Sequence, residues 1–323
     1  MIKVAIVGAT GVVGETIERV LEERRVPLER IGRFASRARD GVEATTSEAL
    51  LPYDVVFFAS SEDACATFAP AIVERGGVVI DNSSAYRMSG NVPLVIPEIN
   101  PSDVRAEHRI FPVANCTAII LCMALAPIKL VAGLRSVRVA TYQAASGAGR
   151  AGLEELQFGE RAIVERTPEP QPTIFPASLA RNVIPQVGSF DGEGYCDEEN
   201  KVREETRKML GIPELRVSVT TVRVPVRTAH SEAVWFKTER DTTVDELARA
   251  FNNAPGVVFH EHGIVTPREV EGTDLVHVAR LRREDETSRR NFALWCVGDQ
   301  LRKGAATNGV QILELLLQKG YVG

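Results

Sequence analysis

Cys116 is the residue of this sequence best placed to act as a nucleophile. An extended apolar run ends at Ala114 and Asn115, and a second apolar run after Cys116 is long enough for a buried helix. The pattern predicts a strand-to-helix corner at Cys116. There the positive end of the helix dipole favours a thiolate, which attacks carbonyl carbon near neutral pH. The alternative is a small core residue, a common role for cysteine beside an apolar helix.

A glycine-rich turn near the N-terminus predicts a dinucleotide site. Residues 3–7 are apolar and mostly β-branched, residues 8–14 read GATGVVG, and a helical pattern follows through Ile17 and Leu21. Between a strand and a helix, such glycines let the backbone approach a pyrophosphate at the helix N-terminus. A tight turn without a ligand is the alternative. The predicted contacts are Gly8, Thr10, Gly11, Val12, Val13 and Gly14.

The second predicted strand, residues 31–35, favours NADP over NAD. It lacks the acid at its end that accepts a ribose 2′-hydroxyl, and Ser36, Arg37 and Arg39 follow instead. A hydroxyl and guanidinium groups suit a 2′-phosphate. The alternative is a solvated loop with ordinary arginines.

Two further apolar runs complete a Rossmann-type, doubly wound parallel sheet. Residues 54–59 and 78–81 read as buried strands with a helix at 64–75 between them. Arg87 lies beyond the second strand, where such sheets bind ligands. It is predicted to bind a phosphate or carboxylate, or else to form a surface salt bridge.

The organisation changes after residue 116 to a predicted α+β catalytic and dimerisation domain. Helices are expected at 153–164 and 202–210, and a proline-rich stretch, 165–176, as an irregular excursion. We predict an NADP-binding domain at 1–116 plus 300–323 and a second domain at 117–299. The last helix, 304–318, should pack on the first domain. Strands are expected at 136–142, 216–226 and 233–237.

Composition narrows the function classes. The 323 residues carry a formal net charge of -5 and no long basic run, so nucleic acid is not an expected partner. No apolar run is long enough to span a membrane, and a cytoplasmic protein is expected. Five scattered cysteines disfavour disulfides, although Cys196 could be a second reactive thiol. His260 and His262 have metal-like spacing but no third ligand nearby, so no metal is expected.

Several motifs, in this order and spacing, resemble aspartate-semialdehyde dehydrogenase. They are GATGVVG at 8–14, DNSSAYRM at 81–88, NCTAI at 115–119, TYQAASGAG at 141–149, NVIPQ at 182–186, DEENK at 197–201, VRVPVRTAHSEAV at 222–234 and LRKGAATNGVQI at 301–312. The resemblance covers nearly the whole chain. It implies NADPH-dependent reductive dephosphorylation of L-aspartyl 4-phosphate to L-aspartate 4-semialdehyde, on the route to lysine, threonine and methionine, by a homodimer.

The resemblance also implies roles for individual residues. Cys116 resembles the nucleophile that forms a thioester, His230 the general acid and base, and Gln143 an amide that orients the substrate. Arg223 resembles the arginine that binds the substrate carboxylate through a planar fork. The implied substrate contacts further include Arg87, Asn115, Glu198 and Lys201, and the implied cofactor contacts include Ser146, Gly147 and Gln300.

The sequence departs from the family pattern in three places. Ala114 replaces a usual proline, Gln300 replaces a usual asparagine, and the arginine that binds the 2′-phosphate is not fixed. Two other functions stay open. An N-acetyl-glutamyl-phosphate reductase would not need Glu198 for a free ammonium, and a non-catalytic NADP-binding paralogue would be expected to have lost Cys116 or His230.

Overall fold

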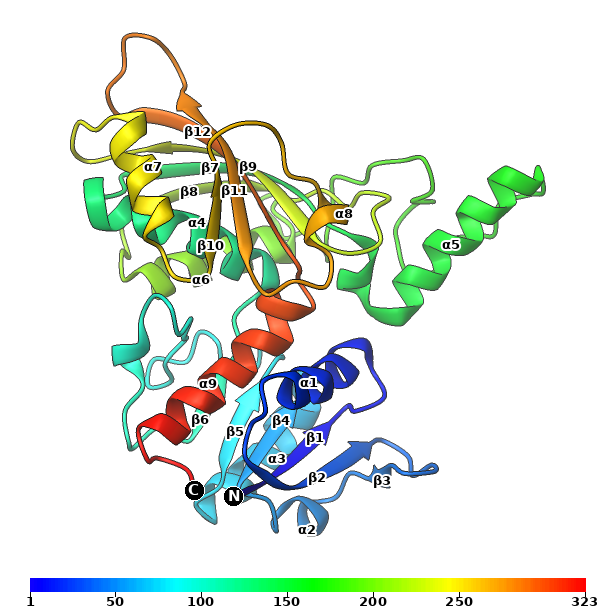
Figure 1. Cartoon of the computed structure of the whole chain (residues 1–323). Coiled ribbons are helices and arrows are strands. Elements are labelled where there is room, and N and C mark those ends of the chain that lie inside the picture. Colours follow the sequence, from blue (N-terminus) through cyan, green and yellow to red (C-terminus); the bar gives the residue numbers. More distant parts are fainter. The chain divides into compact units, whose positions relative to one another are not determined.

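The computed structural model describes all 323 residues, and the chain forms two compact units. The first consists of Met1–Asn115 and Gly304–Gly323, and the second of Cys116–Lys303 (Figure 1). Cys116 is therefore the first residue of the second unit. The last helix, α9, belongs to the first unit although it follows the second in sequence.

The sheet of the first unit is parallel throughout. Its strand order is β3-β2-β1-β4-β5-β6, so the order reverses between β1 and β4. Open parallel sheets of this order bind ligands beyond the carboxyl ends of the strands at the reversal. The predicted Rossmann-type fold is thus confirmed. The strands are β1 Ile2–Val7, β2 Leu28–Ala35, β3 Glu43–Ala44, β4 Val55–Phe58, β5 Val78–Asp81 and β6 Ile110–Pro112.

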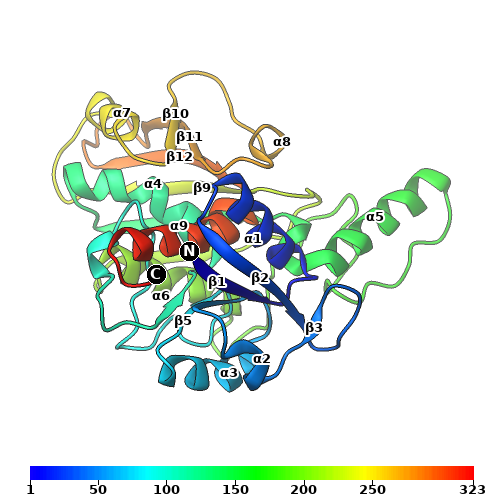
Figure 2. The same cartoon turned by 60° about the horizontal axis from the view of Figure 1, so that its bottom comes forward.

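Helices cover both faces of this sheet, which explains why its central strands are apolar throughout. Figure 2 shows α1 and α9 on one side and α2 and α3 on the other. Helix α3 begins two residues before the predicted position because the Ser61 hydroxyl accepts the Ala64 N–H and caps it. The helices are α1 Val12–Glu23, α2 Ser47–Leu50, α3 Glu62–Glu74 and α9 Thr307–Gln318, with a short 3₁₀ helix at Pro101–Asp103.

The second unit contains a mixed sheet with the strand order β10-β11-β12-β9-β7-β8. Helices α4, α6 and α7 pack on one face of this sheet, where the alternating side chains of β7 and β9 are buried. The opposite face of β7 and β8 leaves Arg138, Tyr142 and Thr220 accessible. The strands are β7 Ser136–Tyr142, β8 Arg216–Thr220, β9 His230–Lys237, β10 Val257–His260, β11 Val276–Arg283 and β12 Asn291–Gly298.

One predicted strand of this unit was too long. Strand β8 ends at Thr220, and the expected continuation to residue 226 is irregular. Pro225 has no N–H to donate to a ladder, and Arg223 instead forms isolated bridges with Gln143 and Ile184. The helices are α4 Cys116–Ala132, α5 Gly149–Glu165, α6 Asp197–Leu210, α7 Val244–Asn252 and α8 Pro267–Val270, and a π-helical turn, Arg302–Ala306, leads into α9.

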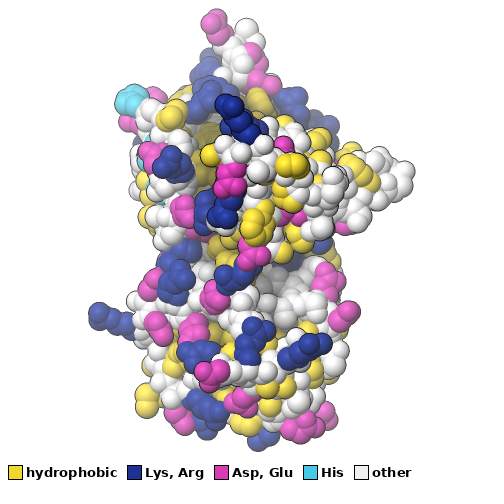
Figure 3. Space-filling model, turned by 90° about the vertical axis from the view of Figure 1, so that its right-hand side faces the viewer, with side chains coloured by type: hydrophobic (Ala, Val, Ile, Leu, Met, Phe, Trp, Pro, Cys, Tyr) yellow, Lys and Arg dark blue, Asp and Glu magenta, His cyan; other side chains and the backbone are white.

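The face of the molecule drawn in Figure 3 carries charges of both signs. On the face in Figure 3, basic and acidic side chains are interspersed with apolar ones rather than gathered into one broad patch of either sign. No helix is long and apolar enough to cross a membrane.

Candidate active site

Cys116 is the first residue of α4, as the sequence predicted. Strand β6 ends at Pro112, three residues connect the two elements, and α4 then continues with buried apolar residues. Cys116 is the only one of the five cysteines that is not buried. Its sulfur therefore combines access with the positive end of a helix dipole.

Gln143 lies directly after β7 and is held by polar groups at both ends of its amide. Its Oε1 accepts the Thr141 hydroxyl at 3.0 Å, and its Nε2 donates to Glu198 Oε1 at 2.9 Å. Thr117, beside Cys116, also donates to Glu198 Oε1, at 3.4 Å. Because Thr141 occupies the oxygen end, the amide keeps its N–H groups on the Glu198 side.

His230 is the first residue of β9 and is fully buried. Its Nδ1 accepts the Ala144 N–H at 3.0 Å, so the ring proton must lie on Nε2. Burial, together with the positive charge of Arg223, holds the pKa of His230 well below its ordinary value of 6.5. Near neutral pH, His230 is thus an uncharged imidazole with an Nε2–H donor.

Arg223 is also buried, and its charge acts on the site. Its Nη1 donates to the Ala144 carbonyl at 2.6 Å, and its guanidinium lies 5.7 Å from the ring centre of Phe175. Burial lowers its pKa, opposed by the negative charges of Glu198 and Cys116. A guanidinium that interacts with Cys116 in this way stabilises the thiolate.

Gly147 brings the next turn of chain against these groups. A Cβ on Gly147 would lie 2.8 Å from Arg223 Nη1 and 3.3 Å from His230 Nε2. A side chain at this position would therefore displace the arginine or the histidine, which explains the glycine.

Helix α6 carries Glu198 in its first turn and Lys201 one turn later. The Cys196 N–H donates to Glu199 Oε2 at 3.0 Å, which fixes the start of the helix. Cys196 itself is buried, with its sulfur 3.0 Å from Thr221 Oγ1. Glu198 and Lys201 lie on one face of α6, as predicted.

The predicted contacts of the glycine turn, residues 8–14, lie in the first unit, where β1 ends and α1 begins. Gly8 has a φ of +85°, and a Cβ on it would lie 2.2 Å from the Ala59 carbonyl oxygen. A Cβ on Gly14 would lie 2.3 Å from the Gly8 oxygen, whereas on Gly11 the nearest atom would be 3.3 Å away. Gly8 and Gly14 are thus required by the fold of the turn, while a Cβ on Gly11 would make one tight contact, with the Gly8 oxygen, that a small shift can relieve.

The other predicted residues of the first unit lie at the carboxyl ends of its strands. Ser36, Arg37 and Arg39 are exposed after β2. Arg87 follows β5, and its Nη2 donates to the Asn82 carbonyl at 2.9 Å. Asn115 is buried and precedes Cys116 in the chain.

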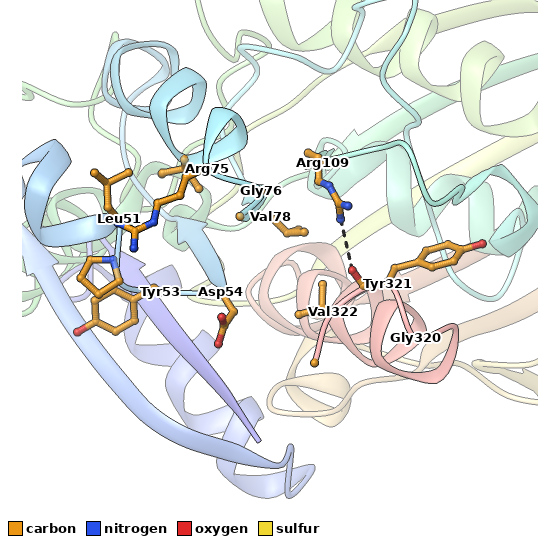
Figure 4. A pocket seen from close by; sticks show the side chains of 14 residues that line it. Leu51, Tyr53, Asp54, Arg75, Gly76, Val78, Arg109, Gly320, Tyr321 and Val322 are labelled. Carbon is orange, nitrogen blue, oxygen red and sulfur yellow. Dashed lines mark hydrogen bonds between the residues drawn. The ribbon is translucent and has the colours of Figure 1, made fainter.

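A cavity of about 320 Å³ in the first unit lies elsewhere (Figure 4). Its lining includes Asp54, Val78 and Arg109, which precede or open β4, β5 and β6 at the amino ends of the strands. Arg109 donates to the Tyr321 carbonyl at 3.3 Å there. The cavity contains none of the predicted site residues.

His260, one of the two histidines with metal-like spacing, contacts His277 rather than His262. His260 Nε2 lies 2.9 Å from His277 Nδ1 and the two rings stack. No group of three or more His, Cys, Asp or Glu side chains is arranged to hold a metal ion.

Sequence reasoning missed the residues that support the site. Thr141 fixes the amide of Gln143, and the backbone of Ala144 contacts both His230 and Arg223. The alternation of Thr141 and Gln143 along one strand face was an available signal. Nothing local marks the backbone of Ala144.

Comparisons with known proteins agree with this architecture. The family model described as semialdehyde dehydrogenase, NAD binding domain, matches residues 3–107, and the one described as semialdehyde dehydrogenase, dimerisation domain, matches residues 125–303. The aspartate-semialdehyde dehydrogenase of Aquifex aeolicus is 39% identical over 99% of both chains. That of Bacillus subtilis is 36% identical over 99% of this chain and 98% of its own.

A solved structure gives the same result. Aspartate semialdehyde dehydrogenase II of Vibrio cholerae, complexed with ASA, is 36% identical, has a TM-score of 0.93 and covers 98% of both chains. Full-length relatives and both family models point to one group of enzymes. The chain therefore belongs to the aspartate-semialdehyde dehydrogenase family.

Proposed function

We propose that this protein catalyses the NADPH-dependent reductive dephosphorylation of L-aspartyl 4-phosphate to L-aspartate 4-semialdehyde through a thioester on Cys116. The observation that carries the proposal is the cluster of Cys116, Gln143, Arg223 and His230 in one unit of a chain from this family. The relatives named above are all aspartate-semialdehyde dehydrogenases, which favours this reaction over the reduction of N-acetyl-glutamyl phosphate.

In the first step the Cys116 thiolate attacks the acyl carbon, a carbon–sulfur bond forms, and the carbon–oxygen bond to phosphate breaks. The neutral His230 holds a proton on Nε2, from which it donates to the oxygen that becomes negative at the reacting carbon. After reduction of the thioester, the tetrahedral carbon collapses to the aldehyde and the thiolate is released.

NADPH, when bound, supplies the hydride that reduces the thioester. The residues proposed to hold it are the glycine turn at 8–14, Ser36, Arg37 and Arg39, and Ser146 and Gly147. The turn fits a pyrophosphate because Gly11 is the N-cap residue of α1 and carries no side chain, so the backbone at the positive end of the helix dipole can approach an anion. The first unit, residues 1–115 with 304–323, is the proposed cofactor domain, and the second the catalytic and dimerisation domain.

The charges of the second unit suit an amino-acid acyl phosphate. Glu198 is the proposed partner of the substrate ammonium and Arg223 that of its carboxylate, while Lys201 is proposed for phosphate together with Arg87 of the first unit. Gln143 presents an N–H to the substrate, because Thr141 fixes its oxygen. An acetylated substrate has no ammonium for Glu198 to meet.

The first experiment is the reverse reaction, followed as NADP reduction with L-aspartate 4-semialdehyde and phosphate. Wild type should turn over in a phosphate-dependent manner, and Cys116→Ala should lose at least about 10⁴-fold in kcat while still binding NADP. Cys196→Ser is the matched control, because this buried thiol should be replaceable without loss of activity. An inactive wild type that binds NADP would contradict the proposal and favour a non-catalytic paralogue.

The proposal also includes that the protein is a homodimer and that it is cytoplasmic. The outer face of β7, β8 and β9 carries Tyr142 and Trp235, and the Tyr142 ring lies 5.3 Å from that of Trp295. Aromatic side chains on an uncovered sheet face are typical of an interface between subunits. Trp235→Arg should convert the dimer to monomer in light scattering, and fractionation of cells tests the location.

A further inference from the structure

Gln300 lies two residues beyond β12 and is buried, with an exposed fraction of 2%. Its Oε1 accepts the Ala229 N–H at 2.7 Å, and its Nε2 donates to the Ser146 hydroxyl. A backbone N–H can only donate, so the amide has a single orientation that satisfies both partners. Both ends of the amide therefore make a hydrogen bond to a protein group.

Ala229 is held in an unfavourable conformation directly before His230. Its φ is +69°, in the left-handed region that an alanine adopts only at a cost, and it is fully buried. Such a conformation persists when surrounding contacts hold it. The bond from its N–H to Gln300 is one contact of this kind, and it acts on the residue that sets the direction of the His230 side chain.

Two segments of chain meet around Gln300. One is the turn Ala145–Ala148, and the other is the segment 226–230 that ends in His230. Backbone bonds join them, from Ala145 N–H to the Val226 oxygen at 2.8 Å and from Ser146 N–H to the Arg227 oxygen at 3.1 Å. Gln300 adds a side-chain bridge between the same two segments, at the end nearest His230.

We propose that Gln300 is a positioning residue that holds the strained Ala229 against the turn of Ser146, and thereby keeps His230 in the orientation needed for proton transfer. The inference rests on the proposed function, because it assigns Gln300 a part in that reaction. Gln300 acts through His230 and does not touch the reacting atoms. The bond from Ala144 N–H to His230 Nδ1 exists only while the histidine keeps this place.

The test compares three variants with wild type. Gln300→Met keeps the length of the side chain but removes both polar contacts, and kcat should fall about tenfold or more because the buried Ala229 N–H loses its acceptor. Gln300→Glu keeps an oxygen at the same place and should stay within about fivefold of wild type. Ala229→Gly combined with Gln300→Met should recover at least about threefold in kcat, since glycine adopts the left-handed conformation without strain.

A spectroscopic readout separates positioning from general destabilisation. The protein has five histidines, so ¹⁵N spectra of the imidazoles, assigned with His230→Asn, report the ring nitrogens of His230 directly. Wild type should show a neutral ring protonated on Nε2. In Gln300→Met the Nδ1 resonance should move, because the bond from Ala144 is weakened. KM for NADP should change less than kcat.

Controls keep the outcomes distinct. Gln318→Met makes the same chemical change on an exposed position of α9, and Arg166→Gly introduces glycine at an exposed left-handed residue; neither should change kcat. Wild-type kcat in Gln300→Met, or a loss of kcat with an unchanged His230 resonance and no recovery by Ala229→Gly, would overturn the inference. If Gln300→Met does not fold, Gln300→Leu replaces it, because leucine also lacks both polar contacts.

Failure of the inference differs from failure of the proposed function. If wild type does not reduce NADP with L-aspartate 4-semialdehyde and phosphate, the function is wrong. If wild type is active but Gln300 variants behave like it, only the inference is wrong. The His230 spectrum needs no turnover and reports on Gln300 in either case.

Discussion

The two sites proposed for this protein are built in different ways. In the first unit, seven consecutive residues, four between β1 and α1 and three in the first turn of α1, form a backbone turn whose shape depends on glycine. In the second unit, Cys116, Gln143, Glu198, Arg223 and His230 come from separate elements and meet as buried or half-buried side chains. The first site depends on local backbone geometry, and the second on tertiary packing and a hydrogen-bond network.

After removal of the Cys116 nucleophile, the largest expected effect tests the hydrogen-bond network of the second unit. His230→Asn should lower kcat by about 10²–10⁴-fold, because it removes the proton held on Nε2. The pH profile of the wild-type enzyme should show no inflection from His230 at pH 6.5 or above, because the pKa of His230 lies well below its ordinary value of 6.5. A pH profile of kcat/KM for both proteins is the measurement, and an inflection shared by both belongs to another group.

The same histidine should affect stability with a definite sign. In the unfolded chain the imidazole of residue 230 takes up a proton as the pH falls below 6.5, whereas in the folded protein it stays uncharged there. The free energy of unfolding therefore falls as the pH decreases below 6.5. His230→Asn should therefore lose less stability than wild type on acidification, as measured by urea unfolding at several pH values.

Two glycines of the turn should differ in effect, one on NADP binding and the other on protein stability. Gly11→Ala should weaken NADP binding by roughly tenfold to a hundredfold with a small change in Tm, because the added Cβ lies 3.3 Å from the Gly8 oxygen and needs only a slight shift of the turn that binds the pyrophosphate. Gly14→Ala should lower Tm, since its Cβ would lie 2.3 Å from the Gly8 oxygen. Titration calorimetry and thermal unfolding separate the two. Equal loss of Tm in both variants would mean that the turn has no binding role.

A smaller effect is expected from Thr141, which is fully buried and acts through Gln143. Thr141→Val should lower kcat/KM about tenfold, because the amide of Gln143 loses the hydroxyl that fixes its oxygen. Thr141→Ser keeps the hydroxyl and should approach wild type. If valine and serine give equal rates, the orientation of Gln143 has another cause.

The smallest effect is expected at Glu232, whose carboxyl group is buried in the sheet of the second unit. Glu232 is fully buried, burial raises its pKa well above 4.5, and Cys296 lies 3.5 Å from its Oε2. The folded protein keeps this proton while the unfolded chain releases it, so stability declines as pH rises above 4.5. Glu232→Gln should remove that decline and raise Tm at neutral pH by about 3 °C. A steeper decline in the variant would contradict the assignment.

The sequence predicted much of both units because their signals are local. The glycine turn, the apolar strands around it and the start of α4 at Cys116 each follow from residues adjacent in the chain. The predicted strand over 216–226 failed because β-branched residues continue past Thr220 while the backbone bonds do not. Arg223 pairs with Gln143 and Ile184, which lie far away in sequence.

The sequence by itself determined the fold class, the family and the residue types available for chemistry. Only the tertiary structure decided the proton position on His230, the orientation of the Gln143 amide and the bracing of Ala229 by Gln300. The physical reason is that the two kinds of interaction act over different separations along the chain. Secondary-structure propensity and hydrophobic periodicity act between residues that are neighbours in the chain. A buried polar group instead bonds to the groups that tertiary packing brings within hydrogen-bond distance, wherever they lie in the sequence.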